Sequence, residues 1–396
     1  MERRYAERIN RVQASAIRQI MKFMADPEVI SLGGGNPAPE SFPVQVIMEI
    51  AQDLLEKAPG KILQYGVTMG YDQLRQAYLE HMVLPKGVKA DLDNILCVTG
   101  STQGISLALE LFLDKGDKVL VENPTFLGTT NVMRKLGAEL IPVEMDEGGV
   151  ILADLEEKIR LHQPKLLYII PNFQNPTGRT LAKDRRQRIA QLAEEYNVIV
   201  LEDDPYGDVR MRGETLPPIK SFDEAGNVIM MNSFSKIISP GMRVGAVTAA
   251  ADIIGKMEVL KQGADVNTAN LNQAICAEFL NRGLLPEHLQ FISNIYRERL
   301  DTMLHGLETY FPQNTQFTRP DGGLFVWVKI PGIANTTDLL TESITRHKVA
   351  FVPGSPFCVN PADGMDCLRL NFSMCDPQKI DTALQRLGSL VQEKMA

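Results

Sequence analysis

Seven short apolar segments recur before residue 250, and helical patterns fall between most of them. Segments of four or five apolar residues are typical of buried strands. Strands that alternate with helices predict a mostly parallel sheet covered by helices, the arrangement of α/β proteins. The expected strands are Ile95–Val98, Lys118–Val121, Glu139–Pro142, Leu166–Ile170, Val198–Leu201, Val228–Met231 and Val244–Thr248.

The pattern changes after Ala251, where helical periodicity dominates, with one long run from Pro286 to about Tyr310. Three more apolar segments and a helix from Pro377 predict a second, smaller sheet with its own helices. A chain of 396 residues is long enough for two domains. We expect an N-terminal arm at 1–30, a large domain at 46–284, and a small α/β domain built from 31–45 and 285–396. The expected strands of the small domain are Leu324–Val328, Ala350–Val352 and Leu368–Phe372.

Composition narrows the class of protein. Lys and Arg number 41 against 49 Asp and Glu, and this net charge of −8 is spread without blocks, which argues against nucleic-acid binding. The first residues lack the apolar core of a secretory signal, and no apolar stretch is long enough to span a membrane. Five cysteines and five histidines are scattered without metal-ligand spacing. We therefore expect a cytoplasmic enzyme that uses no metal.

Lys236 is the first candidate for chemistry. It follows the expected strand Val228–Met231 in Asn232-Ser233-Phe234-Ser235-Lys236, and ligands of open α/β sheets bind at the carboxyl edge. Ser233 and Ser235 offer hydroxyl donors, and Arg243 offers a cationic fork that suits a phosphate. A lysine beside phosphate-binding groups suggests an imine with the phosphorylated aldehyde pyridoxal phosphate. A solvated surface lysine is the alternative.

Two further strand ends carry polar groups that suit the same cofactor. Glu202-Asp203-Asp204-Pro205-Tyr206 follows one strand, and a carboxylate there can hold a protonated pyridine nitrogen. Asn175, in Phe173-Gln174-Asn175-Pro176-Thr177-Gly178, offers an amide donor to a phenolate or a carboxylate. An acidic solvated loop and an ordinary strand-to-helix turn are the alternatives.

The segment Val98-Thr99-Gly100-Ser101-Thr102-Gln103-Gly104 joins a strand to a helical pattern through small residues. Backbone N–H groups and the helix dipole at such a junction can cradle a phosphate. Many turns between a strand and a helix have this composition, so the motif is weak by itself.

Together and in this order, these segments resemble the fold-type I pyridoxal-phosphate aminotransferases of classes I and II, above all those acting on 2-aminoadipate and kynurenine. The resemblance runs from Ile30 to Ser373. It implies that Lys236 forms the Schiff base and carries a proton, and that Asp203 pairs with the pyridine nitrogen. It also implies that Tyr206 and Asn175 bond the ring oxygen. The phosphate would be held by Ser101, Thr102, Ser233, Ser235 and Arg243.

The resemblance also assigns two aromatic residues. Phe126, in Glu122-Asn123-Pro124-Thr125-Phe126, would stack on the pyridine ring, although a core position is the alternative. Tyr65, in Leu63-Gln64-Tyr65-Gly66, would reach the phosphate of the neighbouring subunit. This second role implies a homodimer with shared active sites.

Substrate recognition is expected at Arg369, in Cys367-Leu368-Arg369-Leu370-Asn371. A buried arginine needs an anion, and a bidentate bond to an α-carboxylate meets that need; a structural salt bridge is the alternative. Asn175 would assist, and Gly34 and Gly35 would let the backbone approach the substrate, unless they belong to an ordinary loop. The resemblance implies that Arg18, on an amphipathic helical pattern, grips an acidic substrate side chain.

The expected reaction moves an amino group from an L-amino acid to a 2-oxo acid such as 2-oxoglutarate, in a ping-pong cycle. The donor would be 2-aminoadipate or glutamate, with aromatic or branched apolar amino acids as further candidates. A lyase or decarboxylase on the same fold is one alternative. A non-catalytic effector domain is the other, and the stretch before the fold is too short for the DNA-binding module such domains accompany.

Overall fold

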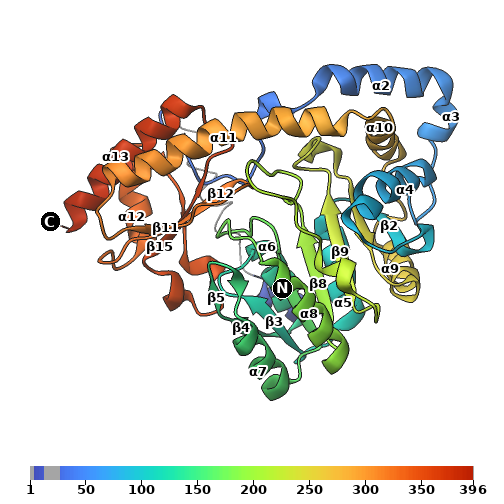
Figure 1. The fold of residues 1–396 in the computed structure, drawn as a ribbon, viewed down its shortest axis with the longest axis horizontal. Coiled ribbons are helices and arrows are strands. Elements are labelled where there is room, and N and C mark those ends of the chain that lie inside the picture. The colour runs from blue at the N-terminus through green and yellow to red at the C-terminus, as the bar shows by residue number, and fades with distance from the viewer. Residues whose placement is uncertain (1–3, 13–26, 396) are drawn as a thin grey trace.

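The computed structural model describes residues 4–12 and 27–395. Its main feature is a mixed sheet of seven strands in the order β2-β10-β9-β8-β7-β3-β4, with helices on its faces (Figure 1). Strand β10 runs antiparallel to both of its neighbours, and the other pairs are parallel. The strands are β2 (Ile95–Val98), β3 (Lys118–Glu122), β4 (Glu139–Val143), β7 (Leu166–Ile169), β8 (Ile199–Asp204), β9 (Val228–Ser233) and β10 (Gly245–Thr248).

All seven expected segments form strands of this sheet, and the predicted α/β class is confirmed. Every residue of β2, β7, β9 and β10 is buried, because helices cover the sheet from both sides. A small antiparallel hairpin, β5 (Met145–Asp146) with β6 (Gly149–Val150), lies beyond β4.

The α-helices of the described residues alternate with the strands and then dominate the C-terminal third. Short 3₁₀ and π turns join them at several points. The α-helices are α2 (Val44–Lys57), α3 (Pro59–Ile62), α4 (Asp72–Tyr78), α5 (Ser101–Phe112), α6 (Leu127–Leu136), α7 (Leu152–His162), α8 (Lys183–Tyr196), α9 (Ala251–Ala264), α10 (Asn270–Asn281), α11 (Leu285–Tyr310), α12 (Thr336–Glu342) and α13 (Pro377–Met395).

A second, antiparallel sheet has the order β11-β12-β15-β14, with β11 (Gln316–Phe317), β12 (Phe325–Lys329), β15 (Cys367–Asn371) and β14 (Val352–Pro353). The single strand expected at Ala350–Val352 is wrong, because the chain changes partner at Phe351. Before it, β13 (Val349–Ala350) pairs with β1 (Ile30–Ser31), and after it β14 pairs with β15. The β1–β13 pair attaches the N-terminal segment to the small sheet.

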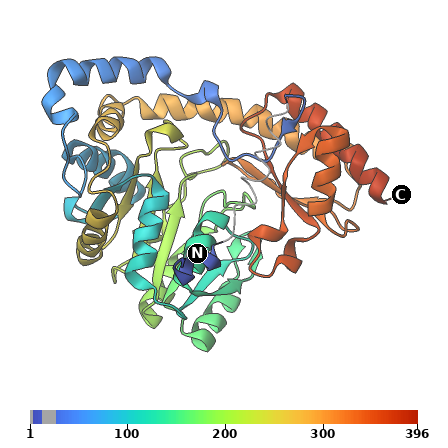
Figure 2. The ribbon, with the colours of Figure 1, turned by 180° about the vertical axis from the view of Figure 1, so that it is seen from behind.

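Helix α11 runs along one side of both sheets and packs against α13 at its far end (Figures 1 and 2). Glycines allow this close contact. A Cβ on Gly306 would lie 2.6 Å from Leu384, and one on Gly388 would lie 2.5 Å from the Tyr310 carbonyl oxygen. The expected division into an N-terminal arm, a large domain and a small domain, with boundaries at residues 30, 45 and 284, stays a prediction.

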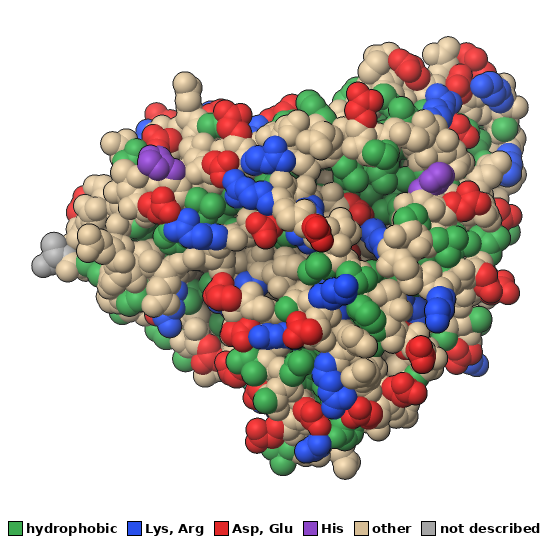
Figure 3. All heavy atoms as spheres, viewed as in Figure 1, with side chains coloured by type: hydrophobic (Ala, Val, Ile, Leu, Met, Phe, Trp, Pro, Cys, Tyr) green, Lys and Arg blue, Asp and Glu red, His purple; other side chains and the backbone are tan. Residues whose placement is uncertain are grey.

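The surface carries interspersed acidic and basic side chains over the face drawn in Figure 3. No helix among the described residues is long and apolar enough to cross a membrane. Within residues 4–12 and 27–395, no group of three or more His, Cys, Asp or Glu side chains is arranged to hold a metal ion.

Candidate active site

A cavity of about 350 Å³ opens where β8 and β9 end and α5 begins. This is the carboxyl edge of the parallel strands, where open α/β sheets bind ligands. A larger hollow of about 690 Å³ includes Lys165 and Val198, which precede β7 and β8, and so lies at the opposite edge. The residues lining the 350 Å³ cavity are Gly35, Asn36, Ser101, Thr102, Ile105, Phe126, Ile170, Asn175, Asp203, Pro205, Tyr206, Ser233, Ser235, Lys236, Pro240, Arg243, Phe325 and Arg369.

Lys236 leaves the end of β9 and points its amine into this cavity. The Nζ atom donates a hydrogen bond to the Gly35 carbonyl oxygen at 2.8 Å. Burial, aided by the charges of Arg369 and Arg243, lowers the pKa of Lys236 to about 8. The amine therefore loses its proton far more readily than a solvated lysine, which a nucleophile requires.

Asp203, at the end of β8, is almost fully buried. Its Oδ2 atom accepts a hydrogen bond from the Tyr168 hydroxyl at 2.7 Å. Its Oδ1 atom is buried without a hydrogen-bond partner, and burial raises the pKa of the carboxyl to about 7. A carboxylate oxygen in this state calls for a cationic N–H donor from a ligand.

Arg369 lies on β15 and is 1% exposed. Its Nη1 donates to Asn175 Oδ1 at 2.8 Å, its Nη2 donates to the Gly33 carbonyl oxygen at 2.9 Å, and its Nε has no partner. The guanidinium stacks on the Phe325 ring at 4.1 Å, and burial lowers its pKa to about 10. Among the described residues no carboxylate pairs with it, so the alternative of a structural salt bridge is not supported.

The other end of the cavity gathers groups that suit a phosphate. Helix α5 begins at Ser101 directly after Gly100, whose φ is +77°. A Cβ at Gly100 would lie 2.2 Å from Arg243 Nη2, so only glycine lets the guanidinium approach. Ser233 and Ser235 complete this end, and the Ser235 N–H donates to Ser233 Oγ at 3.2 Å. Hydroxyls, a helix start and a guanidinium thus face one volume.

Residues 32–38 connect β1 to the 3₁₀ turn at Pro39–Ser41, and two of them, Gly35 and Asn36, line the cavity. We call this segment the arm. Its carbonyl oxygens at Gly33 and Gly34 accept from Arg369, and the one at Gly35 accepts from Lys236. A Cβ added to Gly34 would lie 4.0 Å from the Met374 side chain, and one added to Gly35 would lie 3.5 Å from the Phe325 ring. Both are ordinary contacts. Packing within the chain therefore does not require glycine at these two positions.

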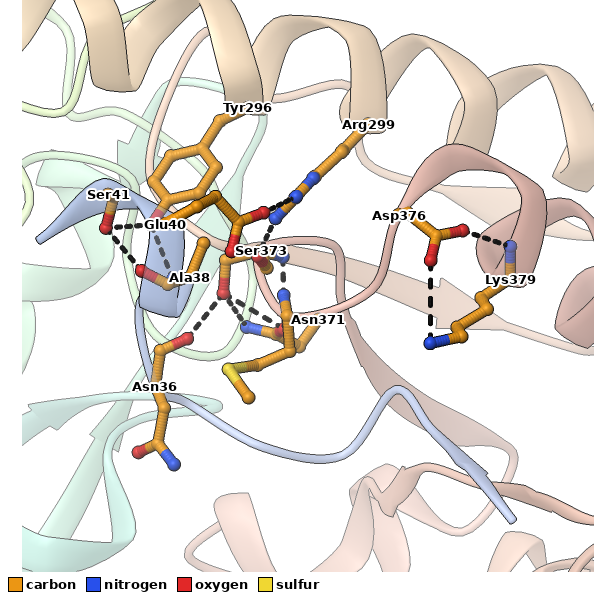
Figure 4. A network of polar contacts seen from close by, with 11 residues as sticks. Asn36, Ala38, Glu40, Ser41, Tyr296, Arg299, Asn371, Ser373, Asp376 and Lys379 are labelled. Carbon is orange, nitrogen blue, oxygen red and sulfur yellow. Dashed lines mark hydrogen bonds and ion pairs between the residues drawn. The ribbon is translucent and has the colours of Figure 1, made fainter. Parts of the chain in front are cut away.

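Side chains from α11 and from the end of β15 hold the arm (Figure 4). Ser373 Oγ donates to the Asn36 carbonyl oxygen at 2.6 Å, and the Ala38 N–H donates to the Tyr296 hydroxyl at 2.9 Å. Arg299 bonds both the Ser373 carbonyl oxygen and Glu40. The strand that carries Arg369 and the segment that covers it are thereby joined.

Most predicted site residues come together here. Phe126 lines the cavity, and Tyr206 packs edge-on against Phe325 at 5.9 Å between centroids. Tyr65 lies apart from the cavity lining and is 83% exposed. Arg18 falls outside the described residues. Gly34 contacts Arg369 through its carbonyl without lining the cavity.

Sequence reasoning missed several groups. Phe325 and Asn36 line the cavity, yet one belongs to an apolar strand and the other to a loop next to proline. Buried Glu122 accepts from the Ile170 N–H and from Gln174, and burial raises its pKa to about 8. Its position at a strand end was the one available signal.

Comparison with known proteins identifies the chain. The family model of aminotransferase class I and II matches residues 27–387. The chain belongs to this family. This aminotransferase chain is 38% identical in sequence to aromatic-amino-acid aminotransferase 1 of Thermococcus litoralis, and the match covers 100% of this chain and 95% of the relative.

Two solved structures agree with this assignment. A kynurenine aminotransferase of Pyrococcus horikoshii, in complex with PMP, matches with a TM-score of 0.95 and 35% identity over 99% of this chain and 98% of its own. An α-aminoadipate aminotransferase of Thermus thermophilus, complexed with N-(5'-phosphopyridoxyl)-L-leucine, matches with a TM-score of 0.90, 35% identity and the same coverage. The chain is a transaminase of fold type I, and its cofactor is pyridoxal 5'-phosphate; a lyase or an effector domain is not favoured.

The cavity fits this cofactor on its own chemistry. The unpartnered Asp203 oxygen matches a protonated ring nitrogen, and the amine with the lowered pKa matches an aldehyde. The end of the cavity that suits a phosphate, where Arg243 lies against Gly100, matches the phosphate group of the cofactor.

Proposed function

We propose that each side chain of the cavity acts on one part of the cofactor. Lys236 is the amine that bonds the aldehyde carbon, and Asp203 holds the ring nitrogen in its protonated form. Tyr206 and Asn175 bond the ring oxygen, and Phe126 stacks on the ring. The phosphate is held by Ser101, Thr102, Ser233, Ser235 and Arg243. The observation that carries the proposal is the buried Asp203 oxygen without a partner, in the same cavity as Lys236.

The α-carboxylate of the amino acid belongs at Arg369 in this proposal, assisted by Asn175. The free Nε atom of Arg369 supports it, as does the finding that packing within the chain does not require glycine at positions 34 and 35. Carbonyl oxygens of the arm now accept from Nη2, and a bidentate carboxylate competes with them for that donor. Substrate binding therefore requires an adjustment of the arm.

The reaction follows from these positions. Bound pyridoxal phosphate supplies a sink for the electrons left when the Cα–H bond of the substrate breaks. The Lys236 amine, when it is not bonded to the cofactor, would take the proton from Cα. Its lowered pKa leaves a neutral amine accessible near neutral pH. Arg369 fixes the carboxylate and so decides which bond of Cα stands near the amine. Asp203, by keeping the ring nitrogen protonated, strengthens the sink.

The proposed donors are 2-aminoadipate or glutamate together with aromatic or branched apolar amino acids, and the proposed acceptor is 2-oxoglutarate. The names of the aromatic, kynurenine and α-aminoadipate relatives support this range. The test incubates the enzyme with 2-oxoglutarate and each amino acid other than glutamate in turn, and measures the glutamate formed. We expect turnover with 2-aminoadipate and with leucine or an aromatic donor, lost in Lys236→Ala. Turnover that survives Lys236→Ala, or none with any donor, would contradict the proposal.

Arg18 is the residue proposed to recognise an acidic side chain. Arg18→Ala is expected to raise KM for glutamate and 2-aminoadipate about tenfold, the loss of one charge-assisted bond, and to leave KM for leucine nearly unchanged. Steady-state kinetics with 2-aminoadipate and with leucine measures the difference in KM. An equal rise for leucine would remove this role.

A homodimer with shared sites and a cytoplasmic location complete the proposal. Exposure of Tyr65 supports the first, since a tyrosine 83% exposed has room to meet a second subunit. All five cysteines are free, which is consistent with a reducing compartment.

A further inference from the structure

A buried lysine that the proposed chemistry does not use lies behind the phosphate end of the cavity. Lys261 is on α9, and its side chain is fully buried. Its ammonium has three protons and three acceptors: Asp265 Oδ1 at 2.7 Å, Gln103 Oε1 at 3.0 Å and Thr268 Oγ1 at 3.1 Å. Because all three of its protons are hydrogen-bonded, this buried cation fixes the positions of the groups around it.

All three acceptors contact Thr99, the residue just before the phosphate end, and Thr268 Oγ1 lies 3.1 Å from Thr99 Oγ1. Gln103 Oε1 also accepts from the Thr99 N–H at 2.8 Å, and Asp265 Oδ2 accepts from Thr99 Oγ1 at 2.5 Å. The Thr99 carbonyl oxygen in turn accepts from Arg243 at 3.4 Å. Lys261 is thus linked to Thr99, the neighbour of Gly100, through one intermediate residue, either Gln103 or Asp265.

The turn that supplies Asp265 and Thr268 is itself strained. Val266 has φ of +66°, a region that β-branched residues rarely adopt. Such a conformation persists where the surrounding contacts over-determine it. The Asp265 carboxylate is well bound: burial raises its pKa, but hydrogen bonds from Lys261 and Thr99 outweigh that effect and the net pKa lies below its usual value.

We infer that Lys261 is a positioning residue for cofactor phosphate: through Gln103 and Asp265 it fixes the Thr99–Gly100–Ser101 turn against Arg243. The inference rests on the proposed phosphate-binding role of this turn. It predicts a defect that depends on the phosphate group, because Lys236 and Asp203 contact other parts of the cofactor and do not bond Lys261.

The experiment compares pyridoxal phosphate with pyridoxal, which lacks the phosphate, on full-length protein freed of cofactor. Equilibrium binding is followed by absorbance. For Lys261→Met we expect Kd for pyridoxal phosphate to rise on the order of tenfold, and Kd for pyridoxal to change less than about twofold. Lys220→Met is the matched control, since Lys220 is also buried in an ion pair, with Asp223 at 2.7 Å, and does not line the cavity. It should change neither constant.

Thr99→Val removes the hydroxyl contacts with Asp265 and Thr268 while keeping the shape of the side chain. This variant decides the question if Lys261→Met does not fold. The same selective loss supports the inference. An equal rise in Kd for pyridoxal phosphate and pyridoxal, or no rise in either, overturns it. Arg243→Gln separates this failure from that of the phosphate site: if Arg243→Gln is selective and the other variants are not, the inference alone fails. If Arg243→Gln also lacks selectivity, the phosphate site and the inference fail together.

Discussion

Asp203 carries a charge with a proposed function, and that charge lowers the stability of the folded protein. Its pKa of about 7 in the cofactor-free protein lies far above that of an unfolded aspartate, so ionising it is unfavourable in the folded state. The penalty is absent below about pH 4, where both states are protonated, grows as pH rises, and is complete above about pH 7. The residue proposed to strengthen the electron sink therefore lowers the stability of the cofactor-free protein at neutral pH.

Asp203→Asn tests both consequences. Turnover should fall at least about a hundredfold, because a neutral amide does not keep the ring nitrogen protonated. The cofactor-free variant should be more stable than wild type at pH 8, by at most about 4 kcal/mol, and the gain should vanish near pH 4. Kinetics and urea unfolding at the two pH values measure this. Near-normal turnover, or equal stability at pH 8, would contradict the assignment.

Residues whose chemistry is out of place in their local pattern could be predicted from the sequence. Arg369 in an apolar strand and Asp203 at a strand end are of this kind. Tyr168 and Lys261 could not be predicted, because one fits an apolar strand and the other fits the polar face of a helix. Their partners come from tertiary structure: Tyr168 bonds Asp203 35 positions away, and Lys261 bonds Gln103 158 positions away.

At the scale of elements, buried strands were predictable because an apolar run of four or five residues allows few other structures. The direction of β10 was not, since an apolar run carries no sign of orientation. The exchange of partners at Phe351 was hidden for a similar reason: all of β13 and β14 is buried, so burial alone does not distinguish two strands from one.

The arm is the element on which substrate binding should depend most. Ser373→Ala removes the hydroxyl that donates to the Asn36 carbonyl oxygen and that also bonds the Asn371 side chain. The change loosens a segment whose own carbonyls contact Arg369. We expect KM for the amino acid to rise about three- to tenfold, the value of one buried hydrogen bond, while Kd for pyridoxal phosphate stays unchanged. Thr302→Ala on α11, which removes an exposed hydroxyl bonded to its own helix, is the control. An unchanged KM, or an equal loss of cofactor affinity, would count against this role of the arm.

At the scale of the whole molecule, the turn after α9 connects the proposed phosphate end with the proposed subunit contact. Thr268 belongs to the Lys261 cluster, and Asn270, two residues on, donates to the Gln64 carbonyl oxygen at 3.0 Å beside Tyr65. A Cβ on Gly66 would lie 2.2 Å from Asn270 Oδ1, so this turn and the Tyr65 segment are closely fitted. Leu63 and Val67, on either side, are also exposed.

Mixed dimers test whether Tyr65 acts in the neighbouring subunit. Tyr65→Ala alone should weaken cofactor binding, and Lys236→Ala alone should be inactive. In a mixed dimer, the site that retains Lys236 receives the intact Tyr65 of its partner, so it should work as in wild type. The other site has neither residue. Mixing the two variants at limiting cofactor should therefore raise activity toward one working site per mixed dimer. If Tyr65 serves its own subunit, every site lacks one residue and mixing yields no gain over the average of the parents, an outcome that would refute shared sites.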